Sequence, residues 1–134
     1  MRFLRPGLSE GLLHLRAGLM QPFPLEPALG EEICAALRQQ VKKLGLSIGD
    51  EPVWAAASFA EQVDPYSREV SLVGTWQGQM RNGSVIFFPD GRIFAEYQVL
   101  LPHPEKEGCY VEAVQVWGLP QQYRGDAVIA EFGK

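Results

Sequence analysis

Hydrophobic and polar positions alternate along much of residues 69–117, with the period of two that is typical of β-strands. The dipeptides Asn82-Gly83 and Asp90-Gly91 interrupt this alternation, and a polar connection follows at residues 102–107. Asn-Gly and Asp-Gly favour two-residue type I′ turns, because both central residues of such a turn take positive φ. The pattern therefore predicts four antiparallel strands in a row, joined by two tight turns and one longer loop.

The length of each turn fixes which side chains share a face of this sheet. Two-residue turns place Phe87 opposite Phe94, and the longer loop places Tyr97 opposite Ala113. One face then carries Ile86, Phe88, Ile93, Ala95, Tyr97, Val99, Leu101, Cys109, Val111, Ala113 and Trp117. The other carries Trp76, Met80, Val85, Phe87, Phe94, Leu100, Tyr110, Val114 and Val116, together with Glu96, Gln98 and Glu112. Because a sheet face in water is usually polar, we expect both of these apolar faces to be covered.

A helix spanning residues 26–44 is the clearest element outside the sheet. Apolar residues recur through it at helical spacing, at Leu29, Ile33, Leu37, Val41 and Leu44. We expect Ile33 and Leu37 to be buried against the sheet face that carries Ile86, Tyr97 and Val99. One helix covers one face of a sheet, so the second face is left for another cover.

The remaining segments are less regular. Residues 9–20 favour a short helix, although residues 13–16 also alternate as a strand does. Residues 53–60 combine strand and helix formers, and we expect 53–59 to pair with 69–76 as a hairpin, with a short final strand at 127–130. The sequence thus predicts one domain, residues 1–134, with an α+β fold. Its sheet is a curved antiparallel β-meander of five or six strands, with the long helix, and a short N-terminal helix if residues 9–20 form one, packed on one face.

Composition narrows the possible functions. The formal net charge of −4 and the lack of a basic run argue against nucleic-acid binding. The sequence contains no apolar stretch of the ~20 residues that span a membrane. Cys34 and Cys109 fall at apolar positions, so we expect buried free thiols, which favour a cytoplasmic location. Two Cys and two His spread along the chain do not form a zinc site, and we expect no metal or cofactor.

The face that the helix leaves open provides the candidate site. Its predicted floor consists of Trp76, Phe87, Phe94 and Val114, and Glu96, Gln98 and Glu112 would orient a ligand. In the predicted register Glu96 and Glu112 are diagonal neighbours, roughly 7 Å apart, and point into a concave cavity. We therefore predict a non-catalytic module that binds a small organic ligand. The alternative is a homodimer that buries this face, and the third possibility is a small enzyme with Glu96 and Glu112 as acid and base.

Overall fold

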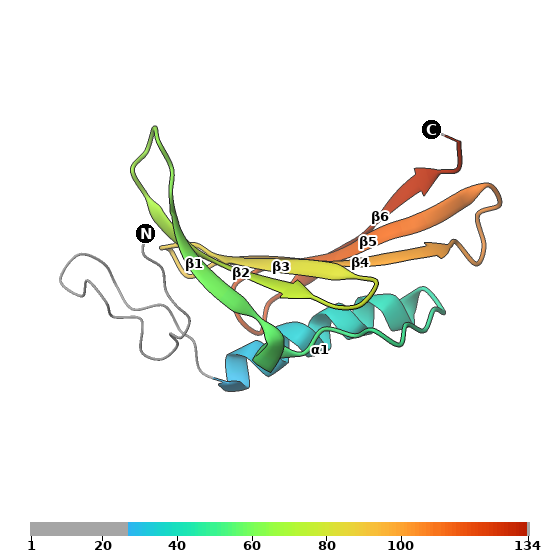
Figure 1. Cartoon of the computed structure of the whole chain (residues 1–134), viewed down its shortest axis with the longest axis horizontal. Helices are drawn as coiled ribbons and strands as arrows, with labels where there is room; N and C mark the ends of the chain where they lie inside the picture. Colours follow the sequence, from blue (N-terminus) through green and yellow to red (C-terminus); the bar gives the residue numbers. More distant parts are fainter. Residues whose placement is uncertain (1–26, 134) are drawn as a thin grey trace.

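The computed structural model describes residues 27–133, which form one antiparallel sheet with one α-helix on it (Figure 1). The helix is α1 (Pro27–Lys43), followed by the short 3-10 helix η4 (Trp54–Ala56). The strands are β1 (Ser58–Val63), β2 (Val70–Gln77), β3 (Asn82–Phe87), β4 (Ile93–Pro102), β5 (Cys109–Gly118) and β6 (Arg124–Glu131), in the order β1 to β6 across the sheet. The predicted α+β fold is therefore confirmed. The helix predicted within residues 9–20 lies outside the described residues.

α1 follows the predicted helix closely at both ends. Its apolar stripe faces the sheet, and Ile33 and Leu37 are both 0% exposed, as predicted. The helix ends where Gly45 takes a φ of +77° and donates its backbone N–H to the carbonyl of Lys42. Lys42 and Lys43 occupy the last turn, where positive charge complements the helix dipole.

The core lies between α1 and the sheet face that α1 covers. That face contributes buried apolar side chains from the four strands β2 to β5: Leu72, Trp76, Val85, Phe87, Ile93, Ala95, Tyr97, Val99, Val111, Val114 and Val116. Trp54 closes one side of this core, with its ring centroid 6.0 Å from that of Phe87 and 6.2 Å from that of Trp76. Gly30 of α1 makes room for Trp54, because a side chain at this position would overlap the indole ring. Tyr97 and Val99 lie under the helix as predicted, whereas Ile86 lies on the opposite face.

The turn between β3 and β4 differs from the prediction. Phe88 donates its N–H to the carbonyl of Arg92, and Gly91 takes a φ of +94°, so the loop contains three residues rather than two. Phe87 therefore pairs with Ile93 and not with Phe94. A second one-residue shift occurs on the other side of β4, where Tyr97 pairs with Val114 rather than Ala113. Because a one-residue shift moves every side chain to the other face, β4 keeps its predicted faces, whereas β3 and residues 114–117 of β5 are inverted relative to the prediction.

The predicted turn at Asn82-Gly83 is wrong, because both residues belong to β3. The chain reverses at residues 78–81 instead, where Gly78 donates its N–H to the carbonyl of Arg81. The Asp50 carboxylate holds this turn by accepting the N–H groups of Met80 and Arg81, at 3.0 and 3.1 Å. This contact spans about thirty positions, so the local pattern around Asn82 contains no sign of it.

The outer hairpin and the last strand both form, but the first strand of the hairpin lies at 58–63 rather than at the predicted 53–59. β1 pairs with β2, but it begins at Ser58 because Trp54–Ala56 form the 3-10 helix. β6 is longer than the predicted 127–130.

The sheet is curved away from α1. The β1–β2 hairpin and the far ends of β4, β5 and β6 both rise on the side opposite the helix (Figure 1). The bend in β4 coincides with a bulge between Gln98 and Leu101, where Leu100 takes a φ of +56°. We call the concave surface away from α1 the open face.

Candidate functional site

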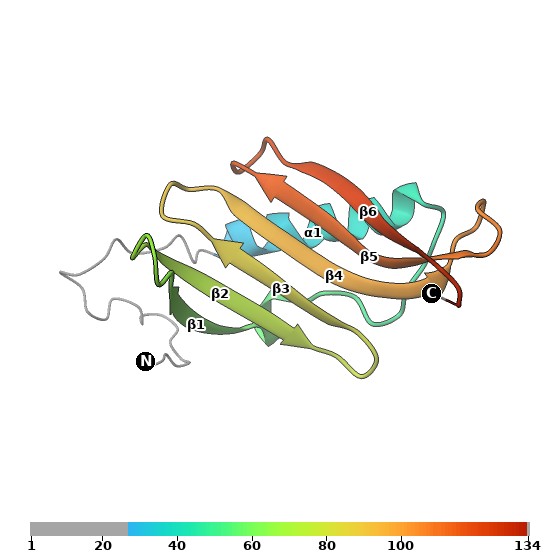
Figure 2. The same cartoon turned by 90° about the horizontal axis from the view of Figure 1, so that it is seen from above.

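A row of apolar side chains crosses the strands of the open face near the β3–β4 turn. Val73, Ile86, Phe94 and Trp117 are successive cross-strand neighbours on β2, β3, β4 and β5. Each of the four is only half-buried. Viewed from above, α1 lies behind the sheet and the strands form the front surface (Figure 2). Of the described helices, none covers this row.

A polar row runs beside the apolar one. It consists of Thr75, Ser84, Glu96, Gln115 and Asp126, again as cross-strand neighbours. The Gln115 side-chain amide donates to the Glu96 carboxylate at 2.9 Å, and the Gln98 side-chain oxygen accepts the Asn82 N–H at 2.9 Å. These hydrogen bonds fix the orientation of the polar groups along the apolar row.

A hollow of about 480 Å³ lies beside the β3–β4 turn, over Ile86, Phe94 and Trp117 of the apolar row. We call it the proximal hollow; its walls include Ile86, Phe88, Arg92, Phe94, Gln115 and Trp117. The Arg92 guanidinium lies 4.9 Å from the centre of the Phe88 ring, and its Nε donates to Asp90 at 2.7 Å. Hydrogen bonds from the Arg92 backbone N–H and then from its side chain lower the pKa of Asp90. The hollow is thus an apolar surface with a fixed cation on one side and an amide on the other.

The seven predicted site residues do not lie together. Trp76, Phe87 and Val114 are buried in the core under α1, so their predicted position on the open face is wrong. The physical reason is that the two register shifts invert β3 and residues 114–117 of β5 relative to β4, and β2 follows β3.

The other four predicted residues are accessible from solvent. Phe94, Glu96 and Gln98 lie on the open face, and Glu112 is exposed at a register shift between β5 and β6. Glu96 pairs with Gln115, three positions along β5 from Glu112. The two carboxylates are therefore not the cross-strand neighbours that the predicted acid–base pair requires.

Sequence reasoning placed Ile86 and Trp117 on the face that the helix was expected to cover, and it gave Arg92 no role in a site. The signal that identifies them is Pro89, because proline before Asp-Gly favours a type I turn closed by a left-handed glycine, which gives a three-residue loop. A loop of that length places Ile86 beside Phe94 and leaves Phe87 in the core.

A second hollow, of about 470 Å³, lies at the opposite end of the sheet. We call it the distal hollow; its walls include Leu100, Leu101, Pro102, Tyr110, Glu131 and Phe132. The rings of Tyr110 and Phe132 stack with their centroids 5.1 Å apart, and Leu100 is 45% exposed at the bulge. The structure therefore exposes apolar surface at both ends of β4 and β5.

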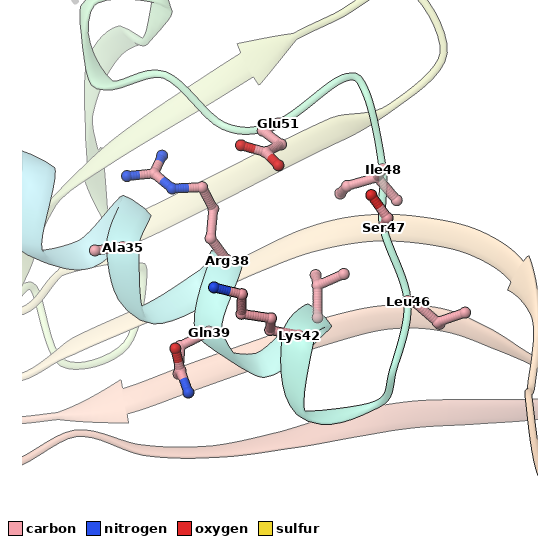
Figure 3. Close-up of a pocket in the computed structure, with 9 residues that line it drawn as sticks. Ala35, Arg38, Gln39, Lys42, Leu46, Ser47, Ile48 and Glu51 are labelled. Carbon is pink, nitrogen blue, oxygen red and sulfur yellow. The ribbon is translucent and has the colours of Figure 1, made fainter.

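A groove of about 470 Å³ separates α1 from the segment that follows it (Figure 3). Arg38 and Lys42 of α1 form one wall, and Ser47 and Glu51 form the other (Figure 3). Arg38 donates from Nη1 to the carbonyl of Pro52 at 2.9 Å, which ties the segment to the helix. Charges of both signs line this polar groove, and Arg38 already has a structural role in it.

Other chemistry has little support in residues 27–133. Within that range, no group of three or more His, Cys, Asp and Glu side chains is placed to hold a metal ion. Burial raises the pKa of the Cys34 thiol to about 11, so it is not a thiolate at neutral pH, and neither Cys34 nor Cys109 forms a disulfide. The helices in the described part of the chain are too short or too polar to span a membrane.

The open face carries an apolar row and two hollows. In the described structure, this exposed apolar surface has no evident role in folding. Comparison with known proteins found no matching family model, curated protein or solved structure.

Proposed function

We propose that this protein is a non-catalytic binding module that holds a small organic ligand in the proximal hollow. The observation that supports the proposal is the apolar row that none of the described helices covers, with Phe94 and Trp117 half-buried beside Arg92 at the proximal hollow. Sheet faces that remain in water are usually polar, whereas ligand sites are apolar surfaces with a few placed polar groups.

The groups around the hollow indicate the kind of ligand. Ile86, Phe94 and Trp117 suit a flat, mainly apolar molecule that can stack on aromatic rings. The guanidinium of Arg92 can donate further N–H groups to an acidic substituent. The Gln115 amide nitrogen already donates to Glu96, which leaves its carbonyl oxygen to accept a hydrogen bond from the ligand.

Two further features belong to this proposal. The free thiols of Cys34 and Cys109 support a reducing, cytoplasmic location. Self-association through the open face is a second candidate function, favoured by the extension of apolar surface well beyond the proximal hollow to Tyr110 and Phe132.

The proposal can be tested with 1-anilinonaphthalene-8-sulfonate, an aromatic molecule with an acidic group. We expect binding at one site per chain, with energy transfer from tryptophan, and at least tenfold weaker binding to Phe94→Ser, which equals about 1.4 kcal/mol. Arg92→Gln should weaken binding of the sulfonate but leave binding of an uncharged naphthalene unchanged.

The matched control is Val63→Ser, which alters another apolar side chain, 57% exposed, outside the open face. It should bind the probe as the unmodified chain does. Equal binding by all the variants would show that the probe recognises a different surface and would refute the proposal.

A further inference from the structure

The exposed apolar surface of the open face is larger than one small ligand can cover. Phe94 and Pro102 mark the proximal and distal hollows on β4, and they are eight positions apart, which corresponds to about 26 Å of strand. The hydrogen-bonded pair Glu96–Gln115 lies between the two hollows. The face is therefore apolar at both ends and polar in the middle.

We propose that a second copy of the chain covers this face, open face against open face. The two sheets would form the inner layers and the two α1 helices the outer layers of a four-layered dimer. Twisted sheets pack face to face about 10 Å apart in many proteins, and monomers rarely leave apolar patches of this extent in water.

The size of the face fits a dimer interface. Six strands about 4.8 Å apart and about 26 Å long present a flat area of about 600 Å². Stable interfaces bury about 800 Å² of accessible surface on each partner, so the open face is of the right order for one.

The two hollows define the arrangement of the two copies. A two-fold axis between the sheets, running across the strands, places the proximal hollow of each copy opposite the distal hollow of the other. The stacked rings of Tyr110 and Phe132 of each copy would then cover the apolar row of the other.

This arrangement also completes the ligand site, and in that respect it rests on the proposed function. The proximal hollow is open to solvent on a single chain. In the dimer the distal surface around Tyr110 of the partner copy would close it. The dimer itself needs no ligand, so the two proposals can fail separately.

Sedimentation velocity of the full chain, without ligand, between about 0.5 and 50 μM tests the proposal. We expect a species of twice the mass of one chain, and at least a hundredfold weaker association for Ile86→Glu, which places a charge in the middle of the apolar row. Val63→Glu is the matched control, because Val63 is exposed outside the open face, and it should dimerise normally. Thermal melting establishes that each variant is folded.

Disulfide cross-linking tests the arrangement of the two copies. It uses chains in which Cys34 and Cys109 are replaced by alanine. Mixing Trp117→Cys with Leu100→Cys under oxidation should yield cross-linked heterodimers in excess over either homodimer. An excess of homodimers would refute the opposed placement of the two hollows.

Three other results would overturn the proposed interface. If the protein is a monomer at all concentrations and iodide quenches the fluorescence of Trp117, the open face is exposed to solvent. Binding of the sulfonate probe to that monomer would leave the proposed function intact. A monomer in which Trp117 is protected would show that the chain covers the face itself. A dimer that Ile86→Glu leaves unchanged would place the interface elsewhere.

Discussion

Tyr97 gives this fold a specific sensitivity to alkaline pH. Its side chain is 2% exposed under α1, and its hydroxyl donates a hydrogen bond to the backbone carbonyl of Asp50. Burial, and then the negative charge of Asp50, raises the pKa of Tyr97 from 10.0 to about 12. The folded protein therefore favours the neutral phenol more strongly than the unfolded chain does.

The sign and size of the effect follow from this difference. The stabilisation by neutral Tyr97 is fully present below pH 10 and is lost as the pH rises from about 10 to about 12, because the unfolded chain releases its proton first. With these two pKa values, the loss between pH 9 and pH 11 is about 1.3 kcal/mol of unfolding free energy. Burial also raises the pKa values of Cys34 and Tyr123, so the unmodified protein loses more than this in total.

Urea denaturation of Tyr97→Phe at pH 9 and pH 11 isolates the contribution of Tyr97. The variant should be about 1 kcal/mol less stable at pH 9, because the hydrogen bond to Asp50 is lost. Between the two pH values it should lose about 1.3 kcal/mol less than the unmodified protein. Tyr66→Phe is the control, because Tyr66 is 94% exposed and should change neither quantity. Equal losses for Tyr97→Phe and the unmodified protein would refute the burial of a neutral phenol at this position.

Three substitutions test the packing and the turns, each by chemical denaturation. Leu37→Ala removes a side chain that is 0% exposed and should cost roughly 2–5 kcal/mol, whereas a cost below 1 kcal/mol would mean that α1 packs differently. Gly83→Ala should cost about 1–3 kcal/mol, because its Cβ would overlap the Tyr97 ring and approach the Glu96 carbonyl oxygen to 2.8 Å; a neutral effect would contradict this close approach. Gly91→Val forces a β-branched residue into a φ of +94° and should cost about 1–3 kcal/mol, whereas a neutral effect would contradict the positive φ at this position.

The sequence predicted the helix and the order of strands because both depend on local patterns. The stripe that contains Ile33 and Leu37 needs only helical geometry to be recognised, and both residues are buried where the stripe placed them. Alternation likewise identified β2 to β5 without any tertiary information.

The faces of the sheet were harder to predict because they depend on single-residue differences in loop length. Pro89 lengthens the β3–β4 loop to three residues, and the bulge between Gln98 and Leu101 shifts the pairing of β4 with β5. Together these shifts invert the strands on either side of β4, which is why Phe94, Glu96 and Gln98 were predicted correctly on the open face but with the wrong neighbours. The turn held by Asp50 depends on a residue far away in the sequence.

The most direct test of the open face as the binding surface uses the three tryptophan indole N–H signals in NMR of the 15N-labelled chain. Trp54 and Trp76 are 9% and 2% exposed in the core, whereas Trp117 is half-buried on the open face. The signal of Trp117, assigned with Trp117→Phe, should shift when anilinonaphthalene sulfonate is added and when the protein concentration is raised, while the other two stay in place. If the Trp117 signal stays unchanged under both conditions, the open face neither binds the ligand nor joins the two copies.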